Sequence, residues 1–225
     1  MGQINHAIIM AAGRGSRMMP LTDDIPKPMA PYGGSTLIAN GIEKIRARIR
    51  HIHVTVGYKK AMLAQHVIEH GASSVFNTEG HDNSWWIYNT LLCDLNEPIY
   101  VLTSDNVVDL DFDLMEENYH ALGNPACMLV PVKPVEGLEG DYIFHENHVV
   151  TELSRHKPSD IYCSGIQILN PAKINQITGE GKDFYSVWQQ LIMKKELKSS
   201  SVYPKRWFTV DTVAQLTALN QMTVS

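Results

Sequence analysis

The chain has 225 residues, of which 44% are hydrophobic, and this is enough apolar material for the buried core of one α/β domain. Its net charge is −5 and it contains no block of Lys and Arg, so a nucleic-acid partner is not expected. Three widely spaced cysteines (Cys93, Cys127 and Cys163) argue against a disulfide framework or a cysteine zinc site. No signal for secretion or for a membrane span is apparent, so we expect a cytoplasmic protein that forms one domain over residues 1–225.

The first half of the chain alternates predicted strands with predicted helices. Residues 6–12 form a continuous apolar run that ends in Gly13, Arg14 and Gly15, which is typical of a buried parallel strand followed by a glycine loop. Hydrophobic spacing then predicts a helix over 37–50, a strand over 52–57, a helix over 62–70, a strand over 74–76 and a strand over 99–104. Strands that alternate with helices indicate a mostly parallel sheet.

The second half has less helix between its strands. Strands are predicted over 126–132, 142–150 and 164–169, followed by a helix over 184–197. Antiparallel pairing is therefore expected in this half. Together the two halves predict an α/β fold, Rossmann-like and doubly wound, with a mostly parallel mixed sheet flanked by helices.

The loop after the first strand has the composition that polyphosphate binding requires. Residues 10–22 read MAAGRGSRMMPLT and residues 26–29 read PKPM, so small residues, backbone amides and three cations fall within twenty positions. Small residues let the backbone approach phosphates, glycine adopts the conformations that aim successive N–H groups inward, and Arg17 and Lys27 can bracket the charge. The string is neither a Walker A loop nor a G-x-G-x-x-G fingerprint.

The whole string resembles the signature of the sugar-1-phosphate nucleotidyltransferase superfamily, A-A-G-x-G-[ST]-R followed by P-L-T and P-K-P. The resemblance implies a GT-A-like fold and a Mg²⁺-dependent enzyme that joins an NTP to a small phosphorylated substrate and releases pyrophosphate. It assigns stabilisation of the leaving pyrophosphate to Arg17 and Lys27. It also assigns the nucleotide-binding loops to Ala11, Ala12, Gly13, Arg14, Gly15, Ser16, Gly57 and Tyr58.

Two carboxylates are candidates for the metal. Asp105 follows the apolar strand over 99–104, which places it at the carboxyl edge of the sheet, where open α/β sheets bind ligands. It resembles the family's metal-binding Asp. Asp211, within residues 207–213, resembles the Asp of the family's late W-x-D-[IV]-x-T element. Mg²⁺ suits such a pair of hard oxygen donors. Asp109, Asp111 and Asp113 are expected to be solvated or to cap a helix.

The acceptor side of the expected site is ambiguous. Segments near 140–142, 152–158 and 163–171 resemble the acceptor elements of the sugar branch, which assigns acceptor binding to Gly140, Tyr142, Lys157, Ser164 and Gly165. The branch's L-G-T-[AG] segment is missing. Residues 81–92 stand in its place and look more like the N-x-x-S-L segment of phosphocholine and related cytidylyltransferases. That match assigns base or ribose contact to Asn83 and Ser84, while Trp85, Trp86 and Tyr88 are either core residues or an aromatic wall for a quaternary ammonium group.

Three functional hypotheses follow. The leading one is an enzyme that makes an NDP-sugar for cell-surface glycans from an NTP and a sugar-1-phosphate. The alternative is a CTP-dependent cytidylyltransferase that acts on phosphocholine or another non-sugar phosphate. The third, from a different class, is a catalytically silent nucleotide-binding regulatory domain. The base, the acceptor and the oligomeric state, a homo-oligomer included, are left open, and neither nucleic acid nor a membrane is an expected partner.

Overall fold

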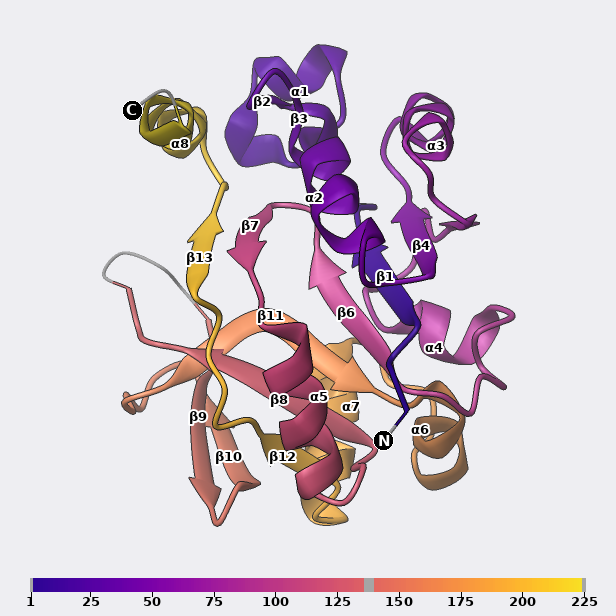
Figure 1. The fold of residues 1–225 in the computed structure, drawn as a ribbon, viewed down its shortest axis with the longest axis vertical. Coiled ribbons are helices and arrows are strands. Elements are labelled where there is room, and N and C mark those ends of the chain that lie inside the picture. Colours follow the sequence, from indigo (N-terminus) through magenta and orange to yellow (C-terminus); the bar gives the residue numbers. More distant parts are fainter. Residues whose placement is uncertain (1, 136–139, 224–225) are drawn as a thin grey trace. The chain divides into compact units, whose positions relative to one another are not determined.

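The computed structural model describes residues 2–135 and 140–223 (Figure 1). The chain forms two compact units that are interleaved along the sequence. The first, here called the loop unit, consists of Asn5–His81, Leu102–Val108 and Arg206–Ser225. The second, here called the hairpin unit, consists of Met1–Ile4, Asp82–Val101 and Asp109–Lys205. The expectation that residues 1–225 act as one domain stays a prediction.

Parallel strands form the sheet of the loop unit. Their order is β5-β4-β1, and their bounds are His6–Met10 for β1, His51–Val56 for β4 and Ser74–Asn77 for β5. Helix α2 (Leu37–Arg46) connects β1 to β4 after the glycine loop, and α3 (Lys60–Glu69) connects β4 to β5. The interior of β1 and nearly all of β4 are buried, as a continuous apolar run predicts for parallel strands.

The rest of the loop unit consists of short strands and helices and the C-terminal helix. In chain order they are η1 (Ser16–Met18), α1 (Leu21–Asp24), η2 (Lys27–Met29), β2 (Pro31–Tyr32), β3 (Ser35–Thr36), β7 (Asn106–Asp109), β13 (Arg206–Thr209) and α8 (Val213–Thr223). Strand β7 pairs with β13, and β2 pairs with β3. One hydrophobic cluster joins these segments through Met18, Ala30, Tyr32, Leu37, Val107, Val210, Leu216 and Leu219. Burial of this cluster fixes the backbone on which the candidate site is built.

The hairpin unit contains the mixed part of the sheet. Its strands follow the order β6-β11-β8-β12-β10-β9, with bounds Ile99–Thr103 (β6), Cys127–Val132 (β8), Tyr142–Glu146 (β9), Val149–Ser154 (β10), Tyr162–Leu169 (β11) and Leu197–Ser199 (β12). The pairings between these strands are antiparallel except that between β12 and β8, which is parallel. The helices are α4 (Trp85–Asn89), α5 (Phe112–Ala121), α6 (Pro171–Ile177) and α7 (Phe184–Met193). The expected mixed α/β fold is confirmed.

Two local predictions differ from the structure, and one helix was not predicted. The strand expected over 142–150 is the β9–β10 hairpin, visible in Figure 1, which turns at Asn147 and His148 with φ of 48° and 68°. The helix expected over 184–197 ends at Met193, because Lys195 adopts the left-handed conformation (φ 59°) and Leu197 begins β12. Helix α5 was not predicted, although Asp111 caps it by accepting a hydrogen bond from the Leu114 amide.

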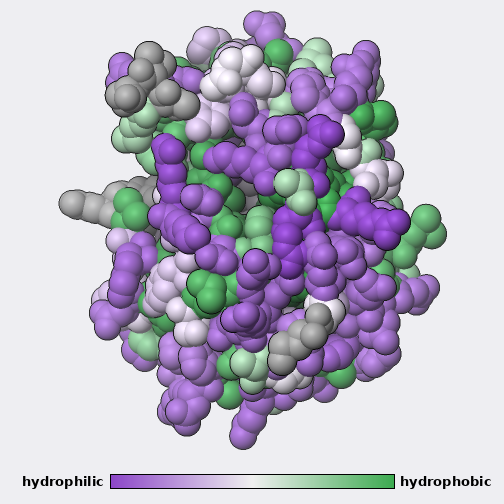
Figure 2. All heavy atoms as spheres, viewed as in Figure 1, coloured by the Kyte–Doolittle hydropathy of each residue, from purple (hydrophilic) through white to green (hydrophobic). Residues whose placement is uncertain are grey.

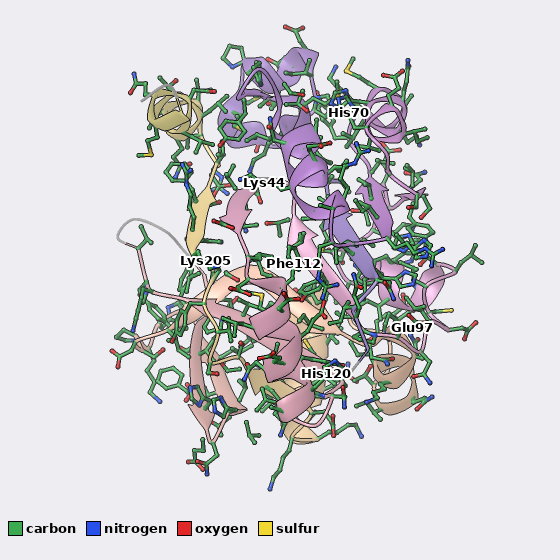
Figure 3. All side chains as sticks on the ribbon, viewed as in Figure 1. Lys44, His70, Glu97, Phe112, His120 and Lys205 are labelled. Atoms are coloured by element: carbon green, nitrogen blue, oxygen red, sulfur yellow. The ribbon has the colours of Figure 1, made fainter. Side chains whose placement is uncertain are left out.

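The visible surface is mainly hydrophilic (Figure 2). No helix of residues 2–135 and 140–223 is long and apolar enough to cross a membrane. A polar side chain at the end of α5 contacts the N-terminal segment. His120, labelled in Figure 3 at the end of α5, places its Nε2 atom 3.1 Å from the carbonyl oxygen of Gly2.

Candidate active site

The glycine loop leaves β1 at Met10, and hydrogen bonds hold both its beginning and its later part. The Ala11 amide donates to Oγ1 of Thr55 at 3.1 Å. The Thr22 hydroxyl donates to the carbonyl oxygen of Gly15 at 3.1 Å, and Thr22 is almost fully buried. The loop is therefore shaped by the protein itself, which is the preorganisation that backbone recognition of phosphate requires.

Gly15 makes room for the Lys27 side chain. Its backbone is left-handed, with φ 67° and ψ 40°, a conformation that favours glycine. A Cβ atom at this position would lie 2.5 Å from Cβ of Lys27, well inside van der Waals contact. The second glycine of the motif thus has two physical reasons to be glycine, and one of them is the approach of the lysine predicted to be catalytic.

Lys27 connects two carboxylates. Its Nζ atom lies 2.8 Å from Oδ2 of Asp105 and 2.9 Å from Oδ1 of Asp211. Arg17 joins the same network, with its guanidinium 3.0 Å from Oδ1 of Asp211. The Lys27 side chain is 11% exposed and the two carboxylates 29% and 18%, whereas Arg17 is 71% exposed. The structure therefore brings together all four residues predicted for charge stabilisation and metal binding.

Backbone contacts position the two carboxylates. The Ser104 amide donates to the carbonyl oxygen of Met10 at 3.1 Å, which holds the segment after β6 against the end of β1. The Val210 amide donates to the carbonyl oxygen of Asp105 at 2.9 Å. Because Asp211 follows Val210 directly, this bond sets the two aspartates side by side.

A capping box fixes Asp211 at the start of α8. Oε1 of Gln215 accepts from the amides of Asp211 and Thr212 at 2.7 and 2.9 Å, and the Gln215 amide donates to Oγ1 of Thr212 at 3.2 Å. Gln215 was not among the predicted site residues. The T-x-x-Q spacing, which is a capping-box signature, is the signal that could have found it.

The turn after β4 packs against the glycine loop. A Cβ atom on Gly57 would lie 2.6 Å from the carbonyl oxygen of Ala12, so only glycine fits. The Tyr58 amide donates to that same oxygen at 3.0 Å, and the Tyr58 hydroxyl donates to the carbonyl oxygen of Thr22 at 2.9 Å. The turn that was predicted to bind the nucleotide thus holds the glycine loop in place. Thr22 belongs to the quoted P-L-T string, but its part in holding the loop was not predicted.

The donor set fits a divalent cation of the Mg²⁺ type. Asp105 and Asp211 present hard oxygen donors, and in this structure the Lys27 ammonium, also a hard cation, lies within hydrogen-bond distance of both. The part of the chain that the structure describes contains no cluster of three or more His, Cys, Asp or Glu side chains suited to a metal. Two carboxylates are nevertheless sufficient for Mg²⁺ when substrate phosphates and water complete its shell.

The residues predicted to bind the acceptor lie in the hairpin unit. Gly140 is required there, because a Cβ atom would lie 2.5 Å from the Tyr162 ring, which makes an edge contact with Tyr142. Gly165 has φ 82° within β11, and the buried Ser164 hydroxyl donates to the Val130 carbonyl oxygen at 2.6 Å.

Lys157, the predicted ligand of the acceptor phosphate, already has partners. Its Nζ atom lies 3.0 Å from Oε2 of Glu152 and 4.1 Å from the centroid of the Phe144 ring. Its side chain is 59% exposed, so these contacts are weak enough to exchange for a phosphate. The acceptor roles of these residues stay predictions.

The residues predicted to contact the base or ribose are engaged in local structure. Oδ1 of Asn83 accepts from the Phe184 amide at 3.0 Å, and the fully buried Ser84 hydroxyl donates to the carbonyl oxygen of Gly181 at 3.2 Å. Trp86 is 1% exposed, so its ring is a core residue and not an aromatic wall for a ligand. Tyr88 places its hydroxyl 2.9 Å from Oγ1 of Thr178. The nucleotide contacts of Asn83 and Ser84 stay predictions.

Burial shifts the pKa of several cysteine and histidine side chains outside the site. Burial raises the pKa of the Cys127 and Cys163 thiols, as expected for unreactive cysteines. Burial, together with His6 and His51, lowers the pKa of His53 to about 4. Nδ1 of His6 lies 3.1 Å from Nε2 of His53, and the His6 ring stacks on those of both other histidines.

Comparison with known proteins gives the family. The Nucleotidyl transferase family profile matches residues 6–180. A mannose-1-phosphate guanyltransferase from Pichia angusta is 28% identical over 220 residues, which cover 90% of this chain and 60% of that protein. The chain thus spans less than two thirds of the length of this relative.

Solved structures show the same fold. The inositol-1-phosphate CTP transferase from T. maritima superposes with a TM-score of 0.79 at 14% identity, covering 99% of this chain and 96% of the other. The CTP:phosphocholine cytidylyltransferase from Streptococcus pneumoniae superposes with a TM-score of 0.73 at 21% identity, covering 96% and 98%. The profile match over most of the sequence decides the assignment: the chain belongs to the Nucleotidyl transferase family.

Proposed function

We propose that this chain transfers a nucleoside monophosphate from an NTP to a sugar-1-phosphate and releases pyrophosphate. The ion-pair network carries the proposal: Nζ of Lys27 lies 2.8 Å from Asp105 and 2.9 Å from Asp211, beside a preorganised glycine loop. A domain that only binds nucleotide has less need of this network. The guanyltransferase relative, which is 28% identical and matches 90% of this chain, supports a sugar phosphate as the acceptor.

The proposed chemistry needs no general base. An oxygen of the acceptor phosphate attacks the α-phosphorus of the NTP, a new P–O bond forms, and the bond from the α-phosphorus to the pyrophosphate oxygen breaks. The attacking phosphate is already largely ionised near neutral pH, because its second pKa is about 6. Catalysis then consists of positioning and charge stabilisation. We assign the stabilisation of charge on the leaving pyrophosphate to Arg17 and Lys27.

The proposed cofactor is Mg²⁺, held by Asp105 and Asp211. When bound, it would polarise phosphoryl oxygens and neutralise charge that develops on them. Lys27 makes hydrogen bonds to both carboxylates in the free chain, so its ammonium must leave at least one of them when a divalent cation takes its place. The phosphates of the NTP are the natural new partner for this ammonium group, since they carry the opposite charge.

The experiment that tests the proposal is a pyrophosphate-release assay with Mg²⁺. It crosses the four ribonucleoside triphosphates and dTTP with sugar-1-phosphates, phosphocholine and other phosphomonoesters. Turnover with a sugar-1-phosphate that disappears in Asp105→Asn, but persists in the exposed neighbour variant Asp109→Asn, supports the proposal. Turnover of CTP with phosphocholine would replace the sugar acceptor by the cytidylyltransferase alternative. Nucleotide binding without turnover of any acceptor would favour a silent regulatory domain.

A further inference from the structure

Two cations lie against the same aromatic ring beside the glycine loop. The guanidinium carbon of Arg14 is 5.4 Å from the centroid of the Tyr58 ring, and Nζ of Lys59 is 5.6 Å from it. Both distances are in the range of cation–π contacts. The ring is itself fixed relative to the loop, because Tyr58 donates hydrogen bonds to the carbonyl oxygens of Ala12 and Thr22.

Neither cation is neutralised by a carboxylate of the described residues. The cations near them in sequence are neutralised. Lys60 pairs with Glu79 at 2.7 Å, and Arg17 pairs with Asp211 at 3.0 Å. Arg14 and Lys59 therefore hold two like charges close together in a chain whose net charge is −5. Two like charges that lie against one ring repel each other, and an anion bound to both would offset that repulsion.

The backbone of Lys59 gives a separate reason to look for a role of its side chain. Lys59 is the N-cap of α3 and has φ 50° and ψ 39°, a left-handed conformation that favours Gly and Asn over Lys. Its side chain makes no capping hydrogen bond. Lysine is thus a poor choice for folding at this position. The positive end of the α3 macrodipole lies at the same turn and adds to the attraction for an anion.

In the free chain the ion-pair network carries little net charge. Lys27 and Arg17 lie on Asp105 and Asp211, so two positive charges are balanced by two negative ones. This network alone offers little net positive charge to a triphosphate. The Arg14 and Lys59 pair, by contrast, has no carboxylate partner in the described part of the chain.

We propose that Arg14 and Lys59, held by the Tyr58 ring, form a second cationic contact for the terminal phosphates of the NTP, which leave as pyrophosphate. This inference rests on the proposed function, because it assumes that the loop binds a triphosphate. It extends that function by adding Lys59, which no motif assigns, and by placing the β- and γ-phosphates toward the β4–α3 turn.

Inorganic pyrophosphate is the probe that tests this contact, because it carries neither base nor sugar. Its affinity is measured by calorimetric titration of the full chain with Mg²⁺ present, for Arg14→Gln, Lys59→Gln and the control Lys60→Gln. The control removes the same charge one residue away, where Glu79 already pairs with it. We expect Arg14→Gln and Lys59→Gln each to weaken pyrophosphate binding about fivefold, and Lys60→Gln to stay within about a factor of two of the wild type.

A fourth variant separates binding from folding. Lys59→Asn suits the left-handed backbone, so its melting temperature should equal or exceed that of the wild type while its pyrophosphate affinity falls. Wild-type pyrophosphate affinity in Lys59→Asn, or equal binding by all three glutamine variants while the wild type turns over an NTP, would overturn this inference alone. A wild-type chain that binds neither NTP nor pyrophosphate would overturn the proposed function as well.

Discussion

Replacing Lys27 with Gln tests the ion-pair network through stability alone. Lys27 is 11% exposed and bonds carboxylates that are 29% and 18% exposed, so the network lies between the surface and the interior. Exposed pairs contribute roughly 0.2–1 kcal/mol, and breaking a buried pair costs roughly 3–5 kcal/mol. A loss of about 2 kcal/mol is therefore expected, which for a chain of this size lowers Tm by about 6 °C. Arg17 still neutralises part of the charge on Asp211, so most of the loss comes from Asp105.

Magnesium distinguishes this explanation from general destabilisation. Melting curves with and without millimolar MgCl₂, in the absence of nucleotide, should show a small rise in Tm for the wild type, because Lys27 holds both carboxylates. Lys27→Gln should regain most of its lost stability, since a cation that binds only the folded state stabilises it by mass action. Lys60→Gln, which breaks an exposed pair, serves as the control. A wild type that gains as much from MgCl₂ as the variant would refute the competition between ammonium and metal.

Three further predictions concern the loop, the metal and the histidine cluster. Gly15→Ala should lower Tm by several degrees and turnover by about tenfold, because the new Cβ atom would lie 2.5 Å from Cβ of Lys27. Gly13→Ala is the stability control, since a Cβ atom there would have nothing within 4 Å. Equal Tm values for the two variants would contradict the clash. Asp105→Asn should reduce pyrophosphate release about 100-fold, and a near-normal rate would exclude it as a metal ligand. The pKa of His53 is lowered from 6.5 to about 4, so the folded state favours its neutral form, and acidification from pH 6.5 toward pH 4 should remove about 2 kcal/mol of unfolding free energy. Urea denaturation across that range should show a weaker pH dependence for His53→Gln, and an unchanged dependence would contradict this reasoning.

Much of the candidate site could be predicted because strong local signals coincide there. A continuous apolar strand followed by small residues and glycine predicts both β1 and the loop, and the strand before Asp105 predicts where that carboxylate lies. Asp211 is different: it is far from Asp105 in sequence, and only the resemblance of its segment to a family motif pointed to it. Its position depends on the hydrogen bond that the Val210 amide donates to the carbonyl oxygen of Asp105, which no pattern within one segment reveals.

The errors arise where the backbone conformation departs from what a residue type predicts. His148 and Lys195 both adopt left-handed conformations in which Gly or Asn is usual. Asn147 is a residue type common in such a turn, but the left-handed His148 beside it is not, so the strand over 142–150 was not recognised as a hairpin. The left-handed Lys195 likewise hid the end of the helix at Met193. Helix α5 was missed because its weakly amphipathic sequence begins among the aspartates near Asp111, which were expected to be solvated or to cap a helix.

The network around Lys27 suggests that the metal and the triphosphate bind together. In the free chain Lys27 is the counter-ion of both carboxylates, so its departure alone would leave two partly buried charges facing each other. A phosphate arriving alone would meet Asp105 and Asp211 as well as the cations, and would be repelled by them. Neither the unpaired carboxylates nor the repulsion of the phosphate arises when the metal and the triphosphate bind together. The carboxylates then exchange the ammonium group of Lys27 for a divalent cation, and Lys27 exchanges the carboxylates for a phosphate. We therefore expect the affinity for NTP to rise steeply with Mg²⁺ in the wild type and to depend on it far less in Asp105→Asn.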